Sequence, residues 1–306
     1  MSVIGFDTSN YTTSIAFFDG VEGENVSKLL PVKQGELGLR QSDAVFHHTK
    51  SLPELSGRLF SHVEGGTITA VGVSTRPRAV EGSYMPCFMV GYSHAKLLSD
   101  TLGVPLYEVS HQQGHVAASL WSAGRMDLMD VPHLAWHLSG GTTELLLVVP
   151  EGKNVNCTRI GGTSDISAGQ LIDRTGQLLR LPFPAGKHLD VLSMDAEKQD
   201  VFKVKCPGLE FSLSGVQNKV QQYSEANSGV ETAAYALRCI IHAVFTATQN
   251  ALKEYPGLSV VFSGGVASNS MLRKCLAPLS PVFCPPQYST DNAMGVAVLA
   301  SRLQEG

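Results

Sequence analysis

Two histidines separated by three residues are the strongest candidates for metal chemistry in this sequence. His111 and His115 stand four positions apart, and Ser110 directly before them is a typical N-cap residue. Side chains four residues apart lie on one face of a helix, so both imidazoles could bind one divalent cation. From the spacing alone, a structural role in a helix cap or a core remains equally open.

A third ligand is best sought where another helix begins with a carboxylate. Thr290-Asp291-Asn292 supplies one, with Thr290 as the expected N-cap of a helix over residues 290–304. Asp291 could instead only stabilise the helix dipole. A zinc protease is excluded, because the motif H-E-x-x-H needs a Glu between the histidines, whereas Gln112, Gln113 and Gly114 occupy these positions.

Two hairpins with hydroxyl-bearing tips are the second chemical feature. Residues 3–20 and 134–149 each read as strand, polar turn and strand, and a shift of 130 positions (139 − 9) superposes Ser9 on Ser139. A Gly- and Ser-rich turn offers backbone N–H groups and hydroxyls to a phosphate. One such turn would be only a turn, but two copies and the related Ser263-Gly264-Gly265 favour a phosphate or nucleotide site.

The elements around these turns repeat as well. We expect a strand over 68–74 with a helix over 87–98, and a strand over 259–263 with a helix over 269–276. Two lobes built on one β-β-β-α-β-α plan follow, namely residues 1–107 with the C-terminal helix 290–306, and residues 108–289. Further long helices are predicted over 51–63, 110–123, 167–181 and 230–254.

The composition bounds the class of protein. The 306 residues include 23 Lys+Arg against 27 Asp+Glu, a formal charge of −4, so any nucleic-acid site must be a local patch. The six cysteines form no C-x-x-C pair, which argues against a zinc knuckle or a disulfide framework. The N-terminus lacks a signal-peptide pattern, and no apolar run reaches the ~18 residues of a membrane span. We therefore expect a cytoplasmic protein without a membrane partner.

Six motifs in order resemble the tRNA N6-adenosine threonylcarbamoyltransferase family, formerly called O-sialoglycoprotein endopeptidase or glycoprotease. The match spans nearly the whole chain, and the order of the motifs makes it specific. They are Gly5-Phe6-Asp7-Thr8-Ser9, the His111 and His115 pair, Ser139-Gly140-Gly141-Thr142-Thr143, Asp165 to Asp173, Ser263 to Asn269, and Thr290 to Met294.

The resemblance implies an α/β fold of the actin, sugar kinase and Hsp70 type with duplicated lobes and a ligand cleft. It implies an acyltransferase that moves a threonylcarbamoyl group from threonylcarbamoyl-adenylate to the exocyclic amine of the adenosine beside the tRNA anticodon. His111, His115 and Asp291 would hold one divalent metal, iron or zinc. The adenylate would be surrounded by Ser139, Gly140, Gly141, Thr142, Asp173, Gly186, Asp190 and Asn269.

The chain departs from the family at the first hairpin. The family has acidic residues at this tip, whereas here the tip is Asn10-Tyr11-Thr12-Thr13. Gln170 replaces a family Glu, and Thr142 stands where His or Asn is usual. An acidic group near the acceptor amine could orient it or accept its proton. A diverged paralogue acting as a non-catalytic nucleotide-binding partner, or a carbamoyltransferase on a small molecule, therefore remains open.

Implied partners are tRNA, the enzyme that makes the adenylate, and a family paralogue; a homodimer is possible as well. A basic strip would be needed for tRNA, although the same residues could be ordinary solvated charges. The candidates for this strip are Lys28, Lys33, Arg40, Lys50, Arg76, Arg78, Arg174, Arg180 and Lys187.

Overall fold

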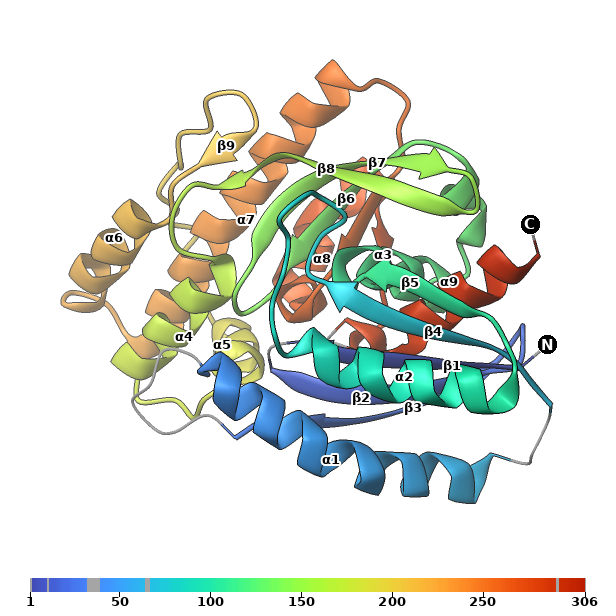
Figure 1. Ribbon diagram of the computed structural model, residues 1–306. Helices are drawn as coiled ribbons and strands as arrows, with labels where there is room; N and C mark the ends of the chain where they lie inside the picture. Colours follow the sequence, from blue (N-terminus) through green and yellow to red (C-terminus); the bar gives the residue numbers. More distant parts are fainter. Residues whose placement is uncertain (1, 10, 32–38, 64–66, 290–291, 306) are drawn as a thin grey trace. The chain divides into compact units, whose positions relative to one another are not determined.

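The computed structural model describes residues 2–9, 11–31, 39–63, 67–289 and 292–305 (Figure 1). These residues divide into two units. Unit 1 comprises residues 1–131, 149–157 and 291–306, and unit 2 comprises residues 132–148 and 158–290, apart from the positions just excluded. The predicted lobes assigned residues 108–131 and 149–157 to the second lobe, whereas these residues, which include α3 (His111–Ser122), belong to unit 1.

Unit 1 is built on a five-stranded sheet with the order β3-β2-β1-β4-β5. The strands β1, β2 and β3 form an antiparallel meander, and β4 and β5 continue the sheet in parallel. The side chains of Ile4 and Phe6 pack into the core beneath α1 and α2, which lie along one face in Figure 1. The strands are β1 (Ser2–Ser9), β2 (Thr12–Phe18), β3 (Gly23–Leu29), β4 (Ile68–Arg76) and β5 (Leu106–Ser110), and the helices are α1 (Gln41–His62) and α2 (Phe88–Leu102).

The other face of this sheet is covered by α9 (Met294–Gln304). A Cβ atom at Gly5 would lie 2.6 Å from the carbonyl oxygen of Ala293, and one at Gly72 would lie 2.8 Å from the Ala300 Cβ. Glycine is therefore required in β1 and β4 because the helix backbone comes this close. In the same way, α9 packs directly on α3, where Gly295 meets Gly114.

Unit 2 carries a six-stranded sheet with the order β11-β10-β6-β7-β8-β9. Its core surrounds Trp136, which is fully buried between Phe211 and Phe262 and donates its indole N–H to Thr248 Oγ1 at 2.9 Å. The strands are β6 (His133–Leu138), β7 (Thr143–Glu151), β8 (Asn154–Thr163), β9 (Glu210–Phe211), β10 (Val260–Ser263) and β11 (Val282–Phe283). The helices are α4 (Ala168–Leu178), α5 (Gly186–Ser193), α6 (Ser214–Ser224), α7 (Gly229–Glu254) and α8 (Ser270–Leu276).

The predicted duplication is confirmed at the level of strand register. In unit 1 Asp7 pairs with Ser14, and in unit 2 His137 pairs with Glu144, which are the same positions after the shift of 130. In each unit a later strand then joins the first strand of the hairpin in parallel, β4 beside β1 and β10 beside β6. Both sheets therefore follow one plan, and the α/β class is confirmed.

Two predicted helix starts are wrong. The helix α1 begins at Gln41 rather than residue 51 and continues through Pro53, because its buried face extends from Ala44 to Leu59. The last helix begins at Met294 rather than residue 290, and the Asn292 side chain accepts the backbone N–H of Met294 at 3.1 Å.

The 26-residue helix α7 is long and apolar enough to cross a membrane by length and composition. However, 67% of the residues in its most apolar window are buried inside the structure. It packs against α5, α6 and α8 in the core of unit 2, and the core helix of a soluble protein passes the same test.

Candidate functional site

The two predicted histidine ligands lie together at the start of α3. The Nε2 atoms of His111 and His115 are 2.9 Å apart. The predicted N-cap is confirmed as a capping box, in which the Ser110 hydroxyl accepts the backbone N–H of Gln113 and the Gln113 side chain accepts that of Ser110. This cap fixes the first turn of the helix and therefore the direction in which both imidazoles leave it.

Asp7, at the end of β1, orients the first imidazole. Its carboxylate lies 2.7 Å from Nδ1 of His111 and also accepts the backbone N–H of Ser9 at 2.8 Å. Only 1% of Asp7 is exposed. Since an ionised carboxylate can only accept, the proton of a neutral His111 lies on Nδ1, and the Nε2 lone pair faces His115. Carboxylates commonly hold metal-binding histidines in this way.

These side chains fit a divalent cation as two of its ligands. Two imidazole nitrogens bound to one ion at ~2.1 Å stand about 3 to 3.4 Å apart, close to the separation observed here. The predicted third ligand, Asp291, lies outside the described residues, as does its neighbour Thr290. Within the part of the chain that the structure describes, no three His, Cys, Asp or Glu side chains form a group that could hold a metal ion.

A buried histidine lies beside the first hairpin tip, where the family carboxylates are replaced. His48 on α1 is fully buried, and its Nδ1 is 2.8 Å from the hydroxyl of Thr13. Burial lowers the pKa of His48 to about 4, although the negative charge of Asp7 opposes this shift. At neutral pH this imidazole is therefore uncharged and tethers the hairpin to α1.

The second hairpin tip, residues 139–142, lies on the N-terminus of α4. The Ser167 hydroxyl donates to the carbonyl of Gly140 at 2.6 Å, and Thr143 Oγ1 accepts the backbone N–H of Ala168 at 2.8 Å. A Cβ atom at Gly169 would lie 2.4 Å from the Gly140 Cα, so the turn and the helix are in backbone contact. The positive end of the α4 dipole is therefore directed at this turn.

The two glycines of this turn, Gly140 and Gly141, have open space where a side chain would lie. A Cβ atom at Gly140 or Gly141 would meet nothing within 4 Å, and neither residue has a positive φ. The fold of unit 2 therefore does not require glycine at either position. Ser139 uses its hydroxyl within the turn, accepting the backbone N–H of Thr142 at 3.1 Å. What the turn offers a ligand is consequently open space beside its backbone.

The loop after β10 meets the same edge of the sheet. Gly264 has a φ of 92°, and a Cβ atom there would lie 2.1 Å from the carbonyl oxygen of Leu138, the last residue of β6. Only glycine can adopt this conformation at this distance. The carboxyl ends of the parallel strands β6 and β10 therefore bring Ser139–Thr142 and Gly264–Asn269 together, which is where open α/β sheets bind ligands.

Asp190 and Asn269, predicted as neighbours of a nucleotide, contact each other. The Asn269 side-chain amide donates to Asp190 Oδ1 at 2.8 Å, and the backbone N–H and hydroxyl of Ser270 donate to the same carboxylate at 3.0 and 2.8 Å. Asn269 is also the N-cap of α8, through the backbone N–H of Leu272. This carboxylate therefore fixes the start of α8 against α5.

Asp173 and Gly186 lie on either side of the connection between α4 and α5. The carboxylate of Asp173 accepts the backbone N–H of Ala185 at 2.9 Å. Its half-buried position raises its pKa, and this hydrogen bond acts in the opposite direction. A Cβ atom at Gly186 would meet only the Ile172 Cγ2 at 4.0 Å, so packing within unit 2 does not demand glycine there.

Two carboxylates with organising roles were missed as individual residues. Asp7 was expected only as part of a hairpin motif, yet it is the partner of His111. Asp165 accepts the hydroxyls of Ser212 and Ser214 and the backbone N–H of Leu213. The signal for Asp7 was present in the sequence, since it is the one charged residue of β1 and directly follows the run from Val3 to Phe6.

Comparison with known proteins identifies the family. The family profile of tRNA N6-adenosine threonylcarbamoyltransferase matches residues 33–298. The chain belongs to this family. The Carboxydothermus hydrogenoformans relative of that name is 31% identical over 312 residues, covering 96% of this chain and 90% of the relative. The Thermosipho africanus relative of the same name is 30% identical over 323 residues, covering 99% of this chain and 94% of the relative. Its relatives are therefore named as transferases that act in tRNA processing.

Solved structures establish the fold class. Full-length HypF in its phosphate- and nucleotide-bound form matches with a TM-score of 0.61 at 16% identity, over the whole of this chain and 47% of that protein. Component A of (R)-2-hydroxyglutaryl-CoA dehydratase from Acidaminococcus fermentans gives a TM-score of 0.56 at 16% identity over all of both chains. The ROK hexokinase from Thermus thermophilus gives 0.53 at 15% identity, also over all of both chains. The chain has the fold of the actin, sugar kinase and Hsp70 class.

Proposed function

We propose that this protein transfers a threonylcarbamoyl group from threonylcarbamoyl-adenylate to the exocyclic amine of the adenosine beside the anticodon of tRNA. Membership of the family supports the reaction class. The observation that carries the proposal for this chain is the arrangement of Asp7, His111 and His115, because a diverged relative without chemistry has no need to keep two convergent imidazoles oriented by a buried carboxylate.

In this proposal His111 and His115 hold a divalent metal, iron or zinc, with Asp291 as a third ligand. When bound, such an ion supplies charge stabilisation to oxygens that become negative during transfer. The contribution of Asp7 is to keep the proton of His111 on Nδ1, so that Nε2 is available to the ion. Ser9 and the capping box of α3 hold Asp7 and the helix start in place.

The adenylate is proposed to bind at the edge formed by β6 and β10. Gly140 and Gly141 leave room for its phosphate beside their backbone, and α4 directs the positive end of its dipole there. Asp190, Asn269 and Asp173 are the proposed ribose and adenine neighbours, as the family resemblance implies. Nucleotide binding by the HypF structure concerns that protein, and its likeness to this chain extends only to the fold.

The proposed reaction depends more on the positioning of donor and acceptor than on proton transfer. The acceptor nitrogen forms a bond to the carbamoyl carbon and loses a proton, and the bond from that carbon to the phosphate oxygen breaks. Its electron pair leaves with AMP, a stable anion that needs no general acid. Holding donor and acceptor in contact and stabilising the anion therefore supply most of the rate.

Transfer can be tested by reconstitution. Purified protein is incubated with threonine, bicarbonate, ATP, an adenylate-making enzyme and unmodified tRNA, and the modified nucleoside is quantified by mass spectrometry after digestion. We expect product from the wild type and a loss of at least tenfold for His111→Ala. Asp7→Asn should lower the affinity for the divalent metal by about 10- to 100-fold. His242→Gln, on α7, is the matched histidine control and should retain activity. Metal bound equally well by wild type and His111→Ala would contradict the proposal.

A second candidate is a non-catalytic partner of a family paralogue. It is favoured by the loss of the tip carboxylates and by apolar side chains exposed on α1 and α2, with Phe46 62%, Leu97 69% and Met89 44% exposed. Between these helices lies a cavity of about 270 Å³ lined by side chains that include Val45 and Met89. Exposed apolar patches of this kind commonly mark protein interfaces.

This candidate predicts a different set of results. The protein would bind an adenine nucleotide and form a complex with the paralogue, or with a second copy, in analytical ultracentrifugation. Leu97→Asp would dissociate the complex, whereas the reconstituted wild type would yield no modified tRNA with a competent set of partner enzymes. Product formation without a paralogue would exclude this candidate.

A further inference from the structure

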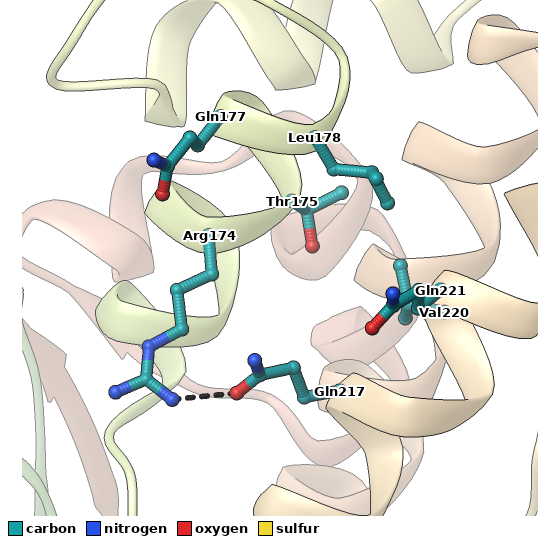
Figure 2. Close-up of a pocket in the computed structure, with 7 residues that line it drawn as sticks. All are labelled: Arg174, Thr175, Gln177, Leu178, Gln217, Val220 and Gln221. Carbon is teal, nitrogen blue, oxygen red and sulfur yellow. Dashed lines mark hydrogen bonds between the residues drawn. The ribbon is translucent and has the colours of Figure 1, made fainter.

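A groove between α4 and α6 in unit 2 has no role in the site described above. Its cavity volume is about 380 Å³, within the range of small-ligand sites. Figure 2 shows side chains from both helices converging on it. They are Arg174, Thr175, Gln177 and Leu178 from α4, and Gln217, Val220 and Gln221 from α6.

The groove combines an apolar floor with an amide rim. Thr175 and Val220 are buried beneath it, and Leu178 extends from α4 toward α6 in Figure 2. The rim carries the side-chain amides of Gln217 and Gln221, each with donors and an acceptor, whereas the Gln177 amide points away from α6 in Figure 2. Arg174 donates from Nη1 to Oε1 of Gln217 at 2.5 Å, which places its guanidinium at the mouth of the groove.

The charge of the walls favours an anionic ligand. No carboxylate lines the cavity, and the sequence of α6 contains no Asp or Glu. The one acidic residue of α4, Asp173, directs its carboxylate to the backbone N–H of Ala185. Arg174 in the cavity wall and Lys219 on α6 are the cations of the two helices. A cationic ligand would find no counter-charge here.

We propose that this groove binds one unpaired nucleotide of an RNA strand. A base is flat, apolar on its faces and lined with donors and acceptors at its edge, which matches an apolar floor beneath glutamine amides. The guanidinium of Arg174 contacts a phosphate of the same strand. The inference rests on the proposed function in one respect, because tRNA is the RNA that would supply the strand.

The test measures binding rather than activity. The two ligands are an end-labelled oligoadenylate of ten nucleotides and an unmodified tRNA transcript, and the binding of each is followed by fluorescence anisotropy. Arg174→Gln should weaken both by about tenfold and reduce the salt slope by about one unit. Gln221→Leu should weaken both by about fivefold without changing the slope, because it removes an uncharged contact. Lys253→Gln removes one exposed charge from the end of α7 and serves as the matched control, with unchanged affinity expected. Circular dichroism melts establish that each variant is folded.

Several results would overturn the inference. Equal affinity and equal salt slope for Arg174→Gln and Lys253→Gln would remove the groove from RNA binding, and so would wild-type affinity of Gln221→Leu. If free AMP displaced the oligonucleotide at an equal concentration, the ligand of the groove would be a mononucleotide and not an RNA strand. Groove-dependent binding of tRNA that is never modified would refute only the proposed function, whereas modification with groove variants that bind normally would refute only this inference.

Discussion

The contact between Gly295 on α9 and Gly114 on α3 yields a stability prediction with a defined size. Gly114 lies between His111 and His115, so this contact sets how closely α9 approaches the helix that carries both imidazoles. A Cβ atom at position 295 would lie 1.8 Å from the carbonyl oxygen of Gly114 and 2.7 Å from the backbone N of Ala118. Gly295→Ala therefore requires the helices to separate by more than an ångström.

Such a separation opens the core around α9, whose residues from Met294 to Ser301 are all buried. Overpacking typically costs about 1 to 3 kcal/mol and occasionally more, and this site lies above that range because both clashing atoms belong to the backbone; the better helix propensity of Ala returns about 1 kcal/mol. We expect Gly295→Ala to lower the free energy of unfolding by about 2 to 4 kcal/mol. A domain is stable by only ~5 to 15 kcal/mol, so much of unit 1 would be close to unfolding.

Two further glycine variants, for which we expect other effects on the free energy of unfolding, are compared with Gly295→Ala in urea titrations. At Gly57 on α1 a Cβ atom meets nothing within 4 Å, so Gly57→Ala should raise stability by about 0.5 to 1 kcal/mol. At Gly114 the nearest atom is a Val296 methyl at 3.2 Å, and we expect an effect within about 1 kcal/mol of zero. If Gly295→Ala matched Gly57→Ala, the close approach of α3 and α9 would be wrong.

Three other outcomes follow from single contacts. Thr248→Val leaves the buried indole N–H of Trp136 without its acceptor and should cost about 1 to 3 kcal/mol in urea titrations. Ser110→Ala removes the hydroxyl that accepts from Gln113 and should cost about 1 kcal/mol, with a matching fall in the thermal midpoint. For Asp165, burial raises the pKa but the hydroxyls and N–H groups around it outweigh this and hold it at about 2. A lowered folded-state pKa means that wild type should exceed Asp165→Asn in stability above about pH 4, and this advantage should vanish as the pH falls toward 2; a difference constant with pH would contradict it.

Local patterns were sufficient to predict most elements. The hairpins, the capped helix at Ser110 and the long helix ending at Glu254 were read from residues adjacent in sequence, and all are confirmed. The predicted helix starts were wrong where packing within the fold overrides the signals of the local sequence. The predicted helix over 51–63 missed residues 41–50, because the buried face of α1 already begins at Ala44. The predicted start at residue 290 rested on Thr290 as N-cap, whereas α9 begins at Met294, whose backbone N–H is accepted by the Asn292 side chain.

The candidate site was only partly predictable, because its decisive contacts join distant segments. Spacing indicated that His111 and His115 share a face, but it could not reveal that Asp7 lies beside them, 104 positions earlier in the chain. The pairing of Asp190 with Asn269 spans 79 positions. Such contacts depend on which strands become neighbours, which follows from the sheet order of each unit rather than from any window of sequence.

The duplication explains why the two units offer different chemistry at equivalent positions. After the shift of 130, Asp7 corresponds to His137, and both lie near the end of the first strand of their hairpin, paired with Ser14 and Glu144 respectively. In unit 1 this position orients an imidazole of α3; in unit 2 His137 Nδ1 lies 3.4 Å from the hydroxyl of Ser263 at the end of β10. Equivalent strand positions therefore orient the His111 imidazole in one unit and bring His137 beside the Ser263 hydroxyl in the other. In the proposed function the metal and adenylate sites lie at these strand ends, so the proposal assigns the departures at the first hairpin tip to the acceptor side of the reaction.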